Sequence, residues 1–394
     1  MVKRLDVLIV GAGAAGMMCA IEAGRRGRSV RLIDHARAPG EKIRISGGGR
    51  CNFTNLEAGP HAFLGENPRF ATSALKRYTQ HDFIKRVDRA GIAWHEKTLG
   101  QLFCDDSAKQ IIRMLTDDIR EVGASLSLGL SVDHLARVDE GFEAALSDGT
   151  TVQATSLVLA TGGKSIPKMG ATGWAYDTAR TLGLRVTETR PALVPLTFDP
   201  DWLAKWSVLS GLSVDAVVST GKTAFREGML FTHRGLSGPS ILQISSYWRE
   251  GEPIVLKMAP DEDVYARLKA AQSDNGKQMA HTALGHIAPR RLADVIAEQE
   301  GVKRKLAEVG DKTLRSLDQA VNGWSVKPTG SEGYRTAEVT LGGVATDELD
   351  QQTMQAKRVP GLYVIGEAAD ITGWLGGYNF QWAWSSGWAA GQHC

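Results

Sequence analysis

The sequence of 394 residues has few cysteines and no long apolar run. Its four cysteines, Cys19, Cys51, Cys104 and Cys394, include no closely spaced pair, which argues against a disulfide framework, a zinc knuckle or a dithiol redox motif. We therefore expect a reducing, cytoplasmic compartment and no metal site. No apolar stretch approaches the roughly 20 residues needed to span a bilayer, so we expect no membrane segment.

The sequence also lacks a strong excess of charge of either sign. Its 46 basic and 44 acidic residues give a net charge of +2, which identifies no partner. Local basic clusters are explained more simply by solvated helix faces than by a nucleic-acid surface. These clusters are Arg25 with Arg26 and Arg28, Arg290 with Arg291, and Lys303 with Arg304 and Lys305.

A glycine-rich motif stands near the start of the chain. Gly11, Gly13 and Gly16 follow an apolar strand at 6–10 and open a helical segment at 17–27, the context that a GxGxxG dinucleotide-binding fingerprint requires. Gly11 allows the tight turn, Gly13 lets a pyrophosphate approach, and Gly16 lets the helix pack on the strand. Asp34 ends the next strand, where a carboxylate can bind an adenosine ribose. The alternative is a glycine turn without a ligand.

Two later segments resemble the strand ends of two-dinucleotide-binding-domain flavoproteins. They are Leu159–Gly163 and Gly361–Asp370. By this analogy Asp370 would hydrogen-bond the ribityl chain, and a helix starting near Gly376 would direct its positive end at the flavin. An ordinary strand-to-turn junction is the alternative for 366–370.

The order of elements predicts that the chain leaves its first domain and later returns to it. Residues 1–190 read as the first part of an α/β, Rossmann-like FAD-binding domain, with a helical segment at 67–90 and short strands at 125–160. Residues 191–333 mix strand-like pieces with a helical stretch at 265–309, which we interpret as an inserted β-rich plus helical substrate or cap domain. Residues 334–394 return to strand, glycine turn and helix.

Taken together, four motifs resemble the aminoacetone-oxidase-like flavoprotein family, which contains the BaiN and YhiN proteins. They are Ser46–Asn55, Leu230–Pro239, Leu341–Val344 with Thr353 and Met354, and Gly376–Gln381. The resemblance spans nearly the whole chain and implies non-covalent FAD. The chain departs from the family pattern at 170–174 and in its tryptophans Trp374, Trp382, Trp384 and Trp388, which at helical spacing favour core packing over a substrate platform.

The motifs and the resemblance together predict the cofactor-binding residues. These are Gly11, Gly13, Ala14, Ala15, Gly16, Asp34, His35, Lys42, Arg44, Ser46, Gly47, Gly48, Arg50, Cys51, Asn52, Val132, Ala160, Thr161, Gly162, Gly366, Glu367, Asp370, Gly376, Gly377, Tyr378, Asn379 and Gln381.

Three residues are candidates for catalysis. Cys51 could donate a proton to a reduced substrate, although packing is the alternative. His233 belongs to a family motif in the inserted segment and could face the substrate, or it could be a histidine without a catalytic role. Tyr378 could orient substrate or flavin. The sequence identifies no general base.

These observations predict an FAD-dependent oxidoreductase that transfers hydride through flavin N5 to or from an unidentified substrate. No second GxGxxG follows a strand, so NADH or NADPH would bind transiently at the flavin, or another acceptor would reoxidise it. A small molecule is the expected substrate. One alternative is reduction of a ribosomal RNA uridine, as associated with YhiN-type members, with RNA as partner. The other is a non-enzymatic FAD redox sensor.

Overall fold

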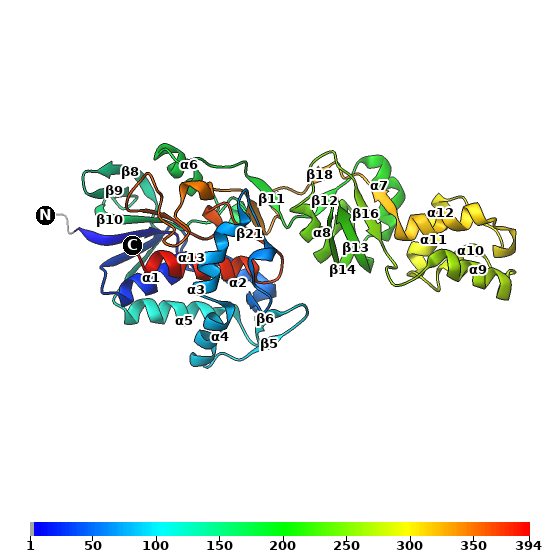
Figure 1. Ribbon diagram of the computed structural model, residues 1–394, viewed down its shortest axis with the longest axis horizontal. Helices are drawn as coiled ribbons and strands as arrows, with labels where there is room; N and C mark the ends of the chain where they lie inside the picture. The colour runs from blue at the N-terminus through cyan, green and yellow to red at the C-terminus, as the bar shows by residue number, and fades with distance from the viewer. Residues whose placement is uncertain (1–3) are drawn as a thin grey trace. The chain divides into compact units, whose positions relative to one another are not determined.

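The computed structural model describes residues 4–394 and divides the chain into two compact units. Unit 1 contains the residues up to Arg190 together with Val339–Cys394, and unit 2 is the continuous segment Pro191–Glu338. Both the blue start and the red end of the chain lie in unit 1 (Figure 1). The two units are described separately below.

The main sheet of unit 1 has the order β7-β2-β1-β10-β9-β8, with β20 paired to β10. Strands β7, β2, β1, β10 and β20 are joined by parallel pairings, whereas β9 and β8 extend the sheet as an antiparallel hairpin. Residues 7–10 and 156–159 are buried, as expected for central strands of a parallel sheet. The strands are β1 (Leu5–Val10), β2 (Val30–Asp34), β7 (Ser125–Leu128), β8 (Val132–Val138), β9 (Gly141–Leu146), β10 (Thr151–Leu159) and β20 (Leu362–Val364).

The last helix of the chain packs closely on the first. A Cβ atom on Gly387 would overlap the carbonyl oxygen of Ala15, so the two helix backbones meet at this point. Trp382 and Trp384 are buried in the core of unit 1, in agreement with the packing role favoured for the tryptophans. The helices of unit 1 are α1 (Ala14–Arg25), α2 (Glu41–Gly49), α3 (Ala71–Arg77), α4 (Gln80–Arg89), α5 (Ala108–Glu121), α6 (Trp174–Thr181) and α13 (Tyr378–Gly391).

The packing of α1 against the end of the chain also brings two cysteines together. The Sγ atoms of Cys19 and Cys394 lie 3.8 Å apart as buried, free thiols. Their hydrogen bond and their burial raise the pKa of the Cys19 thiol. Sequence spacing could not reveal this pair, because the tertiary fold alone brings its members together.

Two small sheets connect distant segments of unit 1. One has the order β3-β6-β5 and the other pairs β21 with β4, all antiparallel. Their strands are β3 (Asn52–Asn55), β4 (Phe63–Leu64), β5 (Trp94–Glu96), β6 (Gln101–Cys104) and β21 (Thr372–Gly373).

Unit 2 has its own antiparallel sheet and its own hydrophobic core. The sheet order is β17-β16-β13-β14-β15-β12-β18. Its strands are β12 (Leu196–Thr197), β13 (Ser213–Thr220), β14 (Thr223–Thr232), β15 (Gly235–Ser237), β16 (Ile254–Lys257), β17 (Trp324–Val326) and β18 (Gly330–Ser331). Its helices are α7 (Pro200–Trp206), α8 (Pro239–Ser245), α9 (Val264–Asn275), α10 (Ala280–Leu284), α11 (Arg290–Gln299) and α12 (Asp311–Asn322). Strands β11 (Arg190–Ala192) and β19 (Val339–Leu341) lie where the chain passes between the units.

The predicted fold class, a split Rossmann-like domain with an inserted β-rich plus helical segment, is confirmed. The expected helical segment at 67–90 is two helices, because Thr79 and Asp82 form a capping box that starts α4 after α3 has ended. The helical stretch expected at 265–309 is likewise broken into α9, α10 and α11. Within residues 4–394, every helix is too short or too polar to traverse a bilayer.

Candidate functional site

The turn between β1 and α1 holds three glycines in different surroundings. Gly11 has a φ of +113°, and a Cβ atom there would overlap the carbonyl oxygen of Ala160. A Cβ on Gly16 would overlap the carbonyl oxygen of Gly11, so these two glycines permit close packing of β1, β10 and α1. Gly13 has open space within 4 Å and caps α1 without a side-chain hydrogen bond. The first amides of α1, beginning at Ala14, therefore face a space that an anionic group can enter.

Asp34 lies beside this turn. Its Oδ2 accepts a 2.6 Å hydrogen bond from the Ala12 amide, and its Oδ1 accepts one of 2.8 Å from the Ala36 amide. Each carboxylate oxygen keeps a second lone pair for a further donor such as a ribose hydroxyl. The Leu130 amide donates to the Asp34 carbonyl oxygen at 2.9 Å, which holds the segment preceding Val132 against the end of β2.

His35, the next residue, has a half-exposed ring. Its Nδ1 lies 3.5 Å from Asp34 Oδ1, and the ring lies so close to Gly170 that a Cβ atom there would overlap its Nε2. His35 is therefore placed beside the same carboxylate.

Helix α2 passes into the glycine-rich loop. Helical geometry ends at Ser46, with a ψ of 146°, and Gly47 and Gly48 follow with φ of +58° and +66°. A Cβ on Gly47 would overlap the ring of Phe103, whereas Gly48 has no atom within 4 Å of its Cβ position. The Nε of Arg44 is buried without a hydrogen-bond partner. The loop therefore combines glycines, which adopt backbone conformations that other residues avoid, with a guanidinium N–H that donates to no acceptor among residues 4–394.

Cys51 closes this loop with a φ of +53° and a fully buried side chain. Burial raises the pKa of its thiol well above the usual value. A thiol with no exposed surface does not reach a substrate in this conformation, so the structure favours the packing alternative for Cys51. Its neighbour Arg50 is exposed.

Lys42 and Glu367 come together from opposite ends of unit 1. Lys42 Nζ donates to Glu367 Oε2 and to Ser165 Oγ, each at 2.6 Å. The Thr340 amide donates to Glu367 Oε1 at 2.8 Å. The Lys42 and Glu367 side chains are therefore largely satisfied by one another and by protein donors. The sequence did not indicate Ser165 or Thr340, because neither belongs to a recognisable motif.

The ends of β10 and β20 form the wall next to α1. Thr161 Oγ1 is buried without a hydrogen-bond partner, and Gly162 follows with a φ of +73°. Gly366 has a φ of +62°, and a Cβ there would be 3.0 Å from that of Ala15. Its amide donates to Ser386 Oγ at 2.9 Å. Helix α13 thus fixes the strand end that faces α1.

Asp370 is a buried acid with little protein hydrogen bonding. Only 2% of its surface is exposed, and its Oδ2 accepts a 2.9 Å bond from the Glu66 amide. Its Oδ1 accepts no hydrogen bond within residues 4–394, which leaves it available to a hydroxyl donor. Burial raises the pKa of Asp370, partly offset by the Glu66 amide.

The start of α13 is uncapped by side chains. Gly376 and Gly377 have φ of +107° and +97°, and Gly377 precedes the helix without a side-chain hydrogen bond. A Cβ on Gly377 would overlap the carbonyl oxygen of Thr54, so the turn lies tightly against β3. Asn52 of that strand is buried, and its amide lies beside Gln101.

Three predicted residues of α13 are held inside the protein. Asn379 Oδ1 accepts from the Gly373 amide at 2.8 Å, and its Nδ2 donates back to the Gly373 carbonyl at 2.9 Å. Gln381 is buried, accepts from the Thr54 hydroxyl at 2.7 Å and donates to the Tyr78 carbonyl at 3.1 Å. The ring of Tyr378 is buried as well. Asn379 and Gln381 therefore support the turn with their side chains.

Unit 1 therefore has the donors and the space that a bound dinucleotide flavin needs. Gly13 leaves open space at the uncapped start of α1, and α13 begins without a side-chain cap. Thr161 Oγ1 and Arg44 Nε are buried polar atoms without partners among residues 4–394, and a ligand's acceptors would satisfy them. The residues present fit FAD.

His233 lies in unit 2, apart from these motifs in the sequence. It forms, with Arg234, the exposed turn between β14 and β15. The Arg234 Nε lies 3.9 Å from Glu332 Oε1. The turn is thus a polar, solvent-accessible feature of unit 2.

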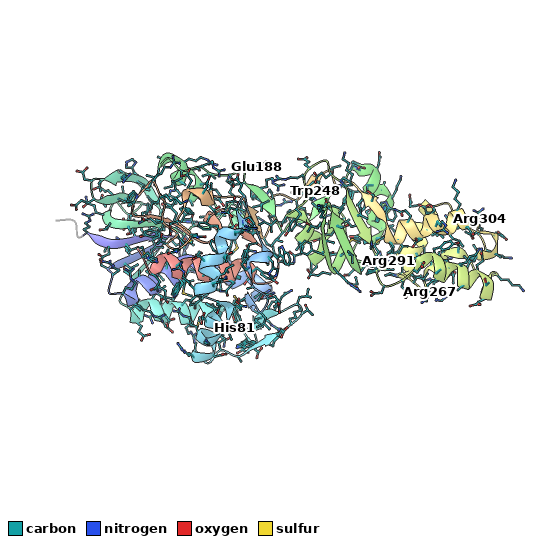
Figure 2. The ribbon with its side chains drawn as sticks, viewed as in Figure 1. His81, Glu188, Trp248, Arg267, Arg291 and Arg304 are labelled. Atoms are coloured by element: carbon teal, nitrogen blue, oxygen red, sulfur yellow. The ribbon has the colours of Figure 1, made fainter. Side chains whose placement is uncertain are left out.

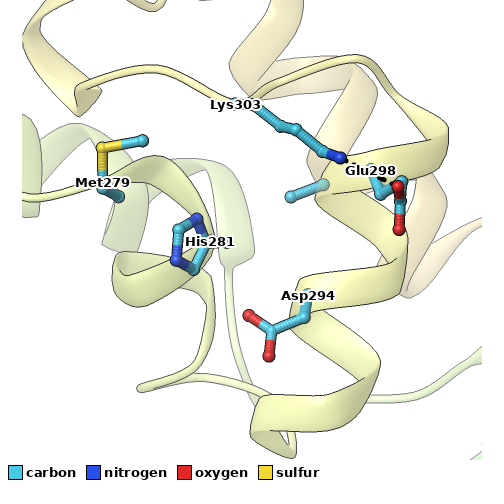
Figure 3. A pocket seen from close by; sticks show the side chains of 6 residues that line it. Met279, His281, Asp294, Glu298 and Lys303 are labelled. Carbon is cyan, nitrogen blue, oxygen red and sulfur yellow. Dashed lines mark hydrogen bonds and ion pairs between the residues drawn. The ribbon is translucent and has the colours of Figure 1, made fainter.

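A cavity of about 350 Å³ opens between α10 and α11 of unit 2 (Figure 3). Met279, His281, Asp294, Ala297, Glu298 and Lys303 line it. Lys303 Nζ donates to Glu298 at 2.8 Å across one side. No residue of the flavoprotein motifs lines this cavity, so its size does not make it the FAD site.

The basic side chains of the helical part of unit 2 point outward. Arg267, Arg291 and Arg304 are exposed and are labelled in Figure 2. Arg267 pairs with Glu262 at 3.2 Å, and Arg291 donates to the Val208 carbonyl at 2.6 Å. This arrangement agrees with solvated helix faces.

A family model described as the HI0933-like protein Rossmann domain matches residues 5–393. The chain belongs to the HI0933-like family. The resemblance to YhiN- and BaiN-type flavoproteins is thereby confirmed, and the protein is an FAD-dependent oxidoreductase.

Several curated relatives of this HI0933-like protein match along its length. It is 49% identical over 399 residues to a ribosomal RNA dihydrouridine synthase of Escherichia coli strain K12, covering 99% of this chain and 98% of that protein. It is 28% identical over 403 residues to a 3-dehydro-bile acid delta(4,6)-reductase of Clostridium scindens, covering 98% of this chain and 97% of that protein. Among solved structures, the open conformation of a flavocytochrome c3 fumarate reductase matches with a TM-score of 0.50 and 18% identity. The match covers 99% of this chain and 78% of that one. At this level of identity the likeness supports the fold alone.

Proposed function

We propose that this HI0933-like protein reduces a uridine of ribosomal RNA to dihydrouridine in the cytoplasm. The observation that carries the proposal is the 49% identity to a ribosomal RNA dihydrouridine synthase over 99% of the chain, which includes all of unit 2 as well as unit 1. The small net charge of +2 does not oppose this, because a folded enzyme can bind RNA through a local surface.

The reaction saturates one carbon–carbon double bond. C5 and C6 of uracil form an α,β-unsaturated system with the C4 carbonyl, so C6 accepts a hydride and C5 accepts a proton. Bound FAD supplies the hydride carrier for this chemistry. A reduced nicotinamide, NADH or NADPH, is the proposed source of the two electrons and binds transiently, since the chain has one GxGxxG motif.

The residues of unit 1 would bind and orient the cofactor. The amides that follow Gly13 would meet the pyrophosphate, and Asp34 would accept from the adenosine ribose. Asp370 Oδ1, which has no protein donor, would accept from a ribityl hydroxyl. The uncapped start of α13 would stabilise negative charge at the pyrimidine end of the reduced ring.

We propose that residues 191–333 serve as the substrate or cap domain of a cofactor domain formed by 1–190 and 334–394. The cofactor motifs lie outside this insertion, and the exposed His233 turn lies within it. His233 would then act on the substrate side, and Tyr378 would help to position the ring system at the start of α13.

A second candidate function is reduction of a small unsaturated carbonyl compound. It is favoured by the 28% identity over 98% of the chain to a 3-dehydro-bile acid delta(4,6)-reductase. Both candidates share hydride addition to a conjugated double bond, and they differ in the size and charge of the substrate.

The two candidates are distinguished by anaerobic reduction of the purified flavoprotein followed by addition of one acceptor at a time. Ribosomal RNA from a strain that lacks this gene should reoxidise the flavin and yield dihydrouridine, detected by nucleoside mass spectrometry. RNA already modified by the wild-type strain is the matched control and should be inert. Rapid reoxidation by a steroid-type enone without any reaction of unmodified RNA would refute the rRNA assignment.

A further inference from the structure

The β5–β6 hairpin of unit 1 ends in an exposed leucine with an unfavourable backbone. The tip is the segment 97–100 between the two strands (Figure 1). Leu99 has a φ of +54°, in the left-handed region that side chains other than glycine rarely adopt, and it is 62% exposed. The strained backbone costs stability, and the exposed side chain offsets none of that cost by burial. Strained backbone of this kind clusters at sites that bind ligands.

Hydrogen bonds hold this tip against the turn that begins α13. Asn55 Nδ2 donates to the Leu99 carbonyl at 3.0 Å and to the Gly376 carbonyl at 2.8 Å. Asn55 is 1% exposed, so water does not compete for these bonds. A Cβ on Gly376 would lie 3.0 Å from the side chain of Gln101, the residue that starts β6. The leucine is therefore fixed in position relative to the start of α13.

A cation accompanies the leucine at the tip. Lys97 Nζ lies 5.6 Å from the centre of the Phe103 ring, and His95 stacks on the same ring at 6.1 Å. Within residues 4–394 no carboxylate pairs with Lys97, although His95 pairs with Asp105. The tip thus combines an apolar side chain with a lysine that has no ion-pair partner within residues 4–394.

We infer that Leu99 contacts a nucleobase next to the target uridine and that Lys97 contacts the adjoining RNA phosphate. This inference rests on the proposed function. Uracil inside a stacked RNA segment cannot meet the flavin ring, so the base must leave its stack. An apolar side chain on a rigid tip can fill the gap that the base leaves, as wedges in other nucleic-acid-binding proteins do. The tip is linked through Asn55 to the helix start proposed to face the flavin, and the Lys97 charge complements the phosphate.

The test is a pair of variants at Leu99. Leu99→Gly removes the wedge and suits the left-handed backbone, so it should fold at least as well as the wild type. Leu99→Met keeps an apolar side chain of similar size and should retain activity. Val208→Ala is the matched control, since Val208 is 61% exposed and lies in unit 2.

Each variant is reduced anaerobically and mixed with unmodified ribosomal RNA in a single turnover. Leu99→Gly should be reoxidised by RNA roughly ten- to hundredfold more slowly, the factor expected for losing the burial of one leucine. Its FAD content and its reoxidation by oxygen should be unchanged and its melting temperature should not fall, which separates a substrate contact from a structural role. Equal rates for Leu99→Gly and the wild type on RNA would overturn the inference alone. If RNA fails to reoxidise the wild type, the proposed function itself is wrong and the inference with it.

Discussion

Gly13→Ala separates a cofactor contact from a role in folding. Gly13 has φ of −82° and ψ of −170°, which alanine adopts freely, and its Cβ position has no protein atom within 4 Å. In the protein without FAD, alanine lowers the conformational entropy of the unfolded chain, which stabilises the fold by about 0.4–1 kcal/mol. Alanine is also a poorer N-cap residue than glycine, and this offsets the gain. The stability should therefore be nearly unchanged. If a pyrophosphate lies against Gly13, the added methyl group should cost about 1–3 kcal/mol. That cost weakens FAD affinity roughly fivefold to more than a hundredfold.

The chain offers a matched control in unit 2. Gly310 caps α12 with φ of −73° and ψ of 160° and also has no atom within 4 Å of its Cβ position. Gly310→Ala should show the same small stability change and full FAD affinity. FAD dissociation constants come from flavin fluorescence, and stabilities come from urea unfolding of the FAD-free protein. Unchanged FAD affinity in Gly13→Ala would refute the placement of the pyrophosphate.

Three further predictions concern single side chains. Asp34→Ala should weaken FAD binding and also destabilise the FAD-free protein by about 1–3 kcal/mol, because the Ala12 amide loses its acceptor. Flavin titration measures the affinity and urea unfolding measures the stability. If the variant keeps both, Asp34 is not part of the site. Because burial raises the pKa of Asp370 above 3.8, its contribution to stability is present at low pH and is lost as the pH rises through the raised pKa. As the pH rises through this pKa, Asp370→Asn should therefore become more stable relative to the wild type. A difference in unfolding free energy between the two proteins that stays constant with pH would contradict the burial argument. His233→Ala should slow turnover on RNA while FAD content stays complete; loss of FAD, or full activity, would contradict its place on the substrate side.

The cofactor motifs were predictable because local physical requirements determine their residues. The surroundings of Gly11 and Gly16 require glycine, so a strand followed by this pattern indicated the turn without tertiary information. The same holds for the parallel β1 and β10, whose buried apolar runs are visible in the sequence.

The partners of the motif residues could not be predicted in the same way. Ser165 and Thr340 meet Glu367 from separate segments, and Asn55 links two turns by contacts that only the tertiary fold creates. The hydrogen bond from the Ala12 amide to Asp34 was likewise not foreseeable from the sequence. Short polar side chains of this kind have no periodic signal.

The conformation of Leu99 could not be predicted from the sequence either. Its backbone φ of +54° depends on the hairpin turn and on Asn55, and leucine itself gives no indication of a left-handed conformation. Nothing in the sequence therefore distinguishes this turn from an ordinary connection between strands. Only the structure shows that an exposed leucine lies beside the helix start proposed to face the flavin.

Stoichiometry provides a direct test of whether the FAD enzyme reduces a ribosomal RNA uridine. The purified protein is photoreduced without oxygen, mixed with excess unmodified ribosomal RNA, and analysed for oxidised flavin, for dihydrouridine and for the cofactor released on denaturation. The released cofactor should be FAD, and one dihydrouridine should form for each flavin that is reoxidised. Flavin reoxidation without dihydrouridine, or FMN as the released cofactor, would contradict this prediction.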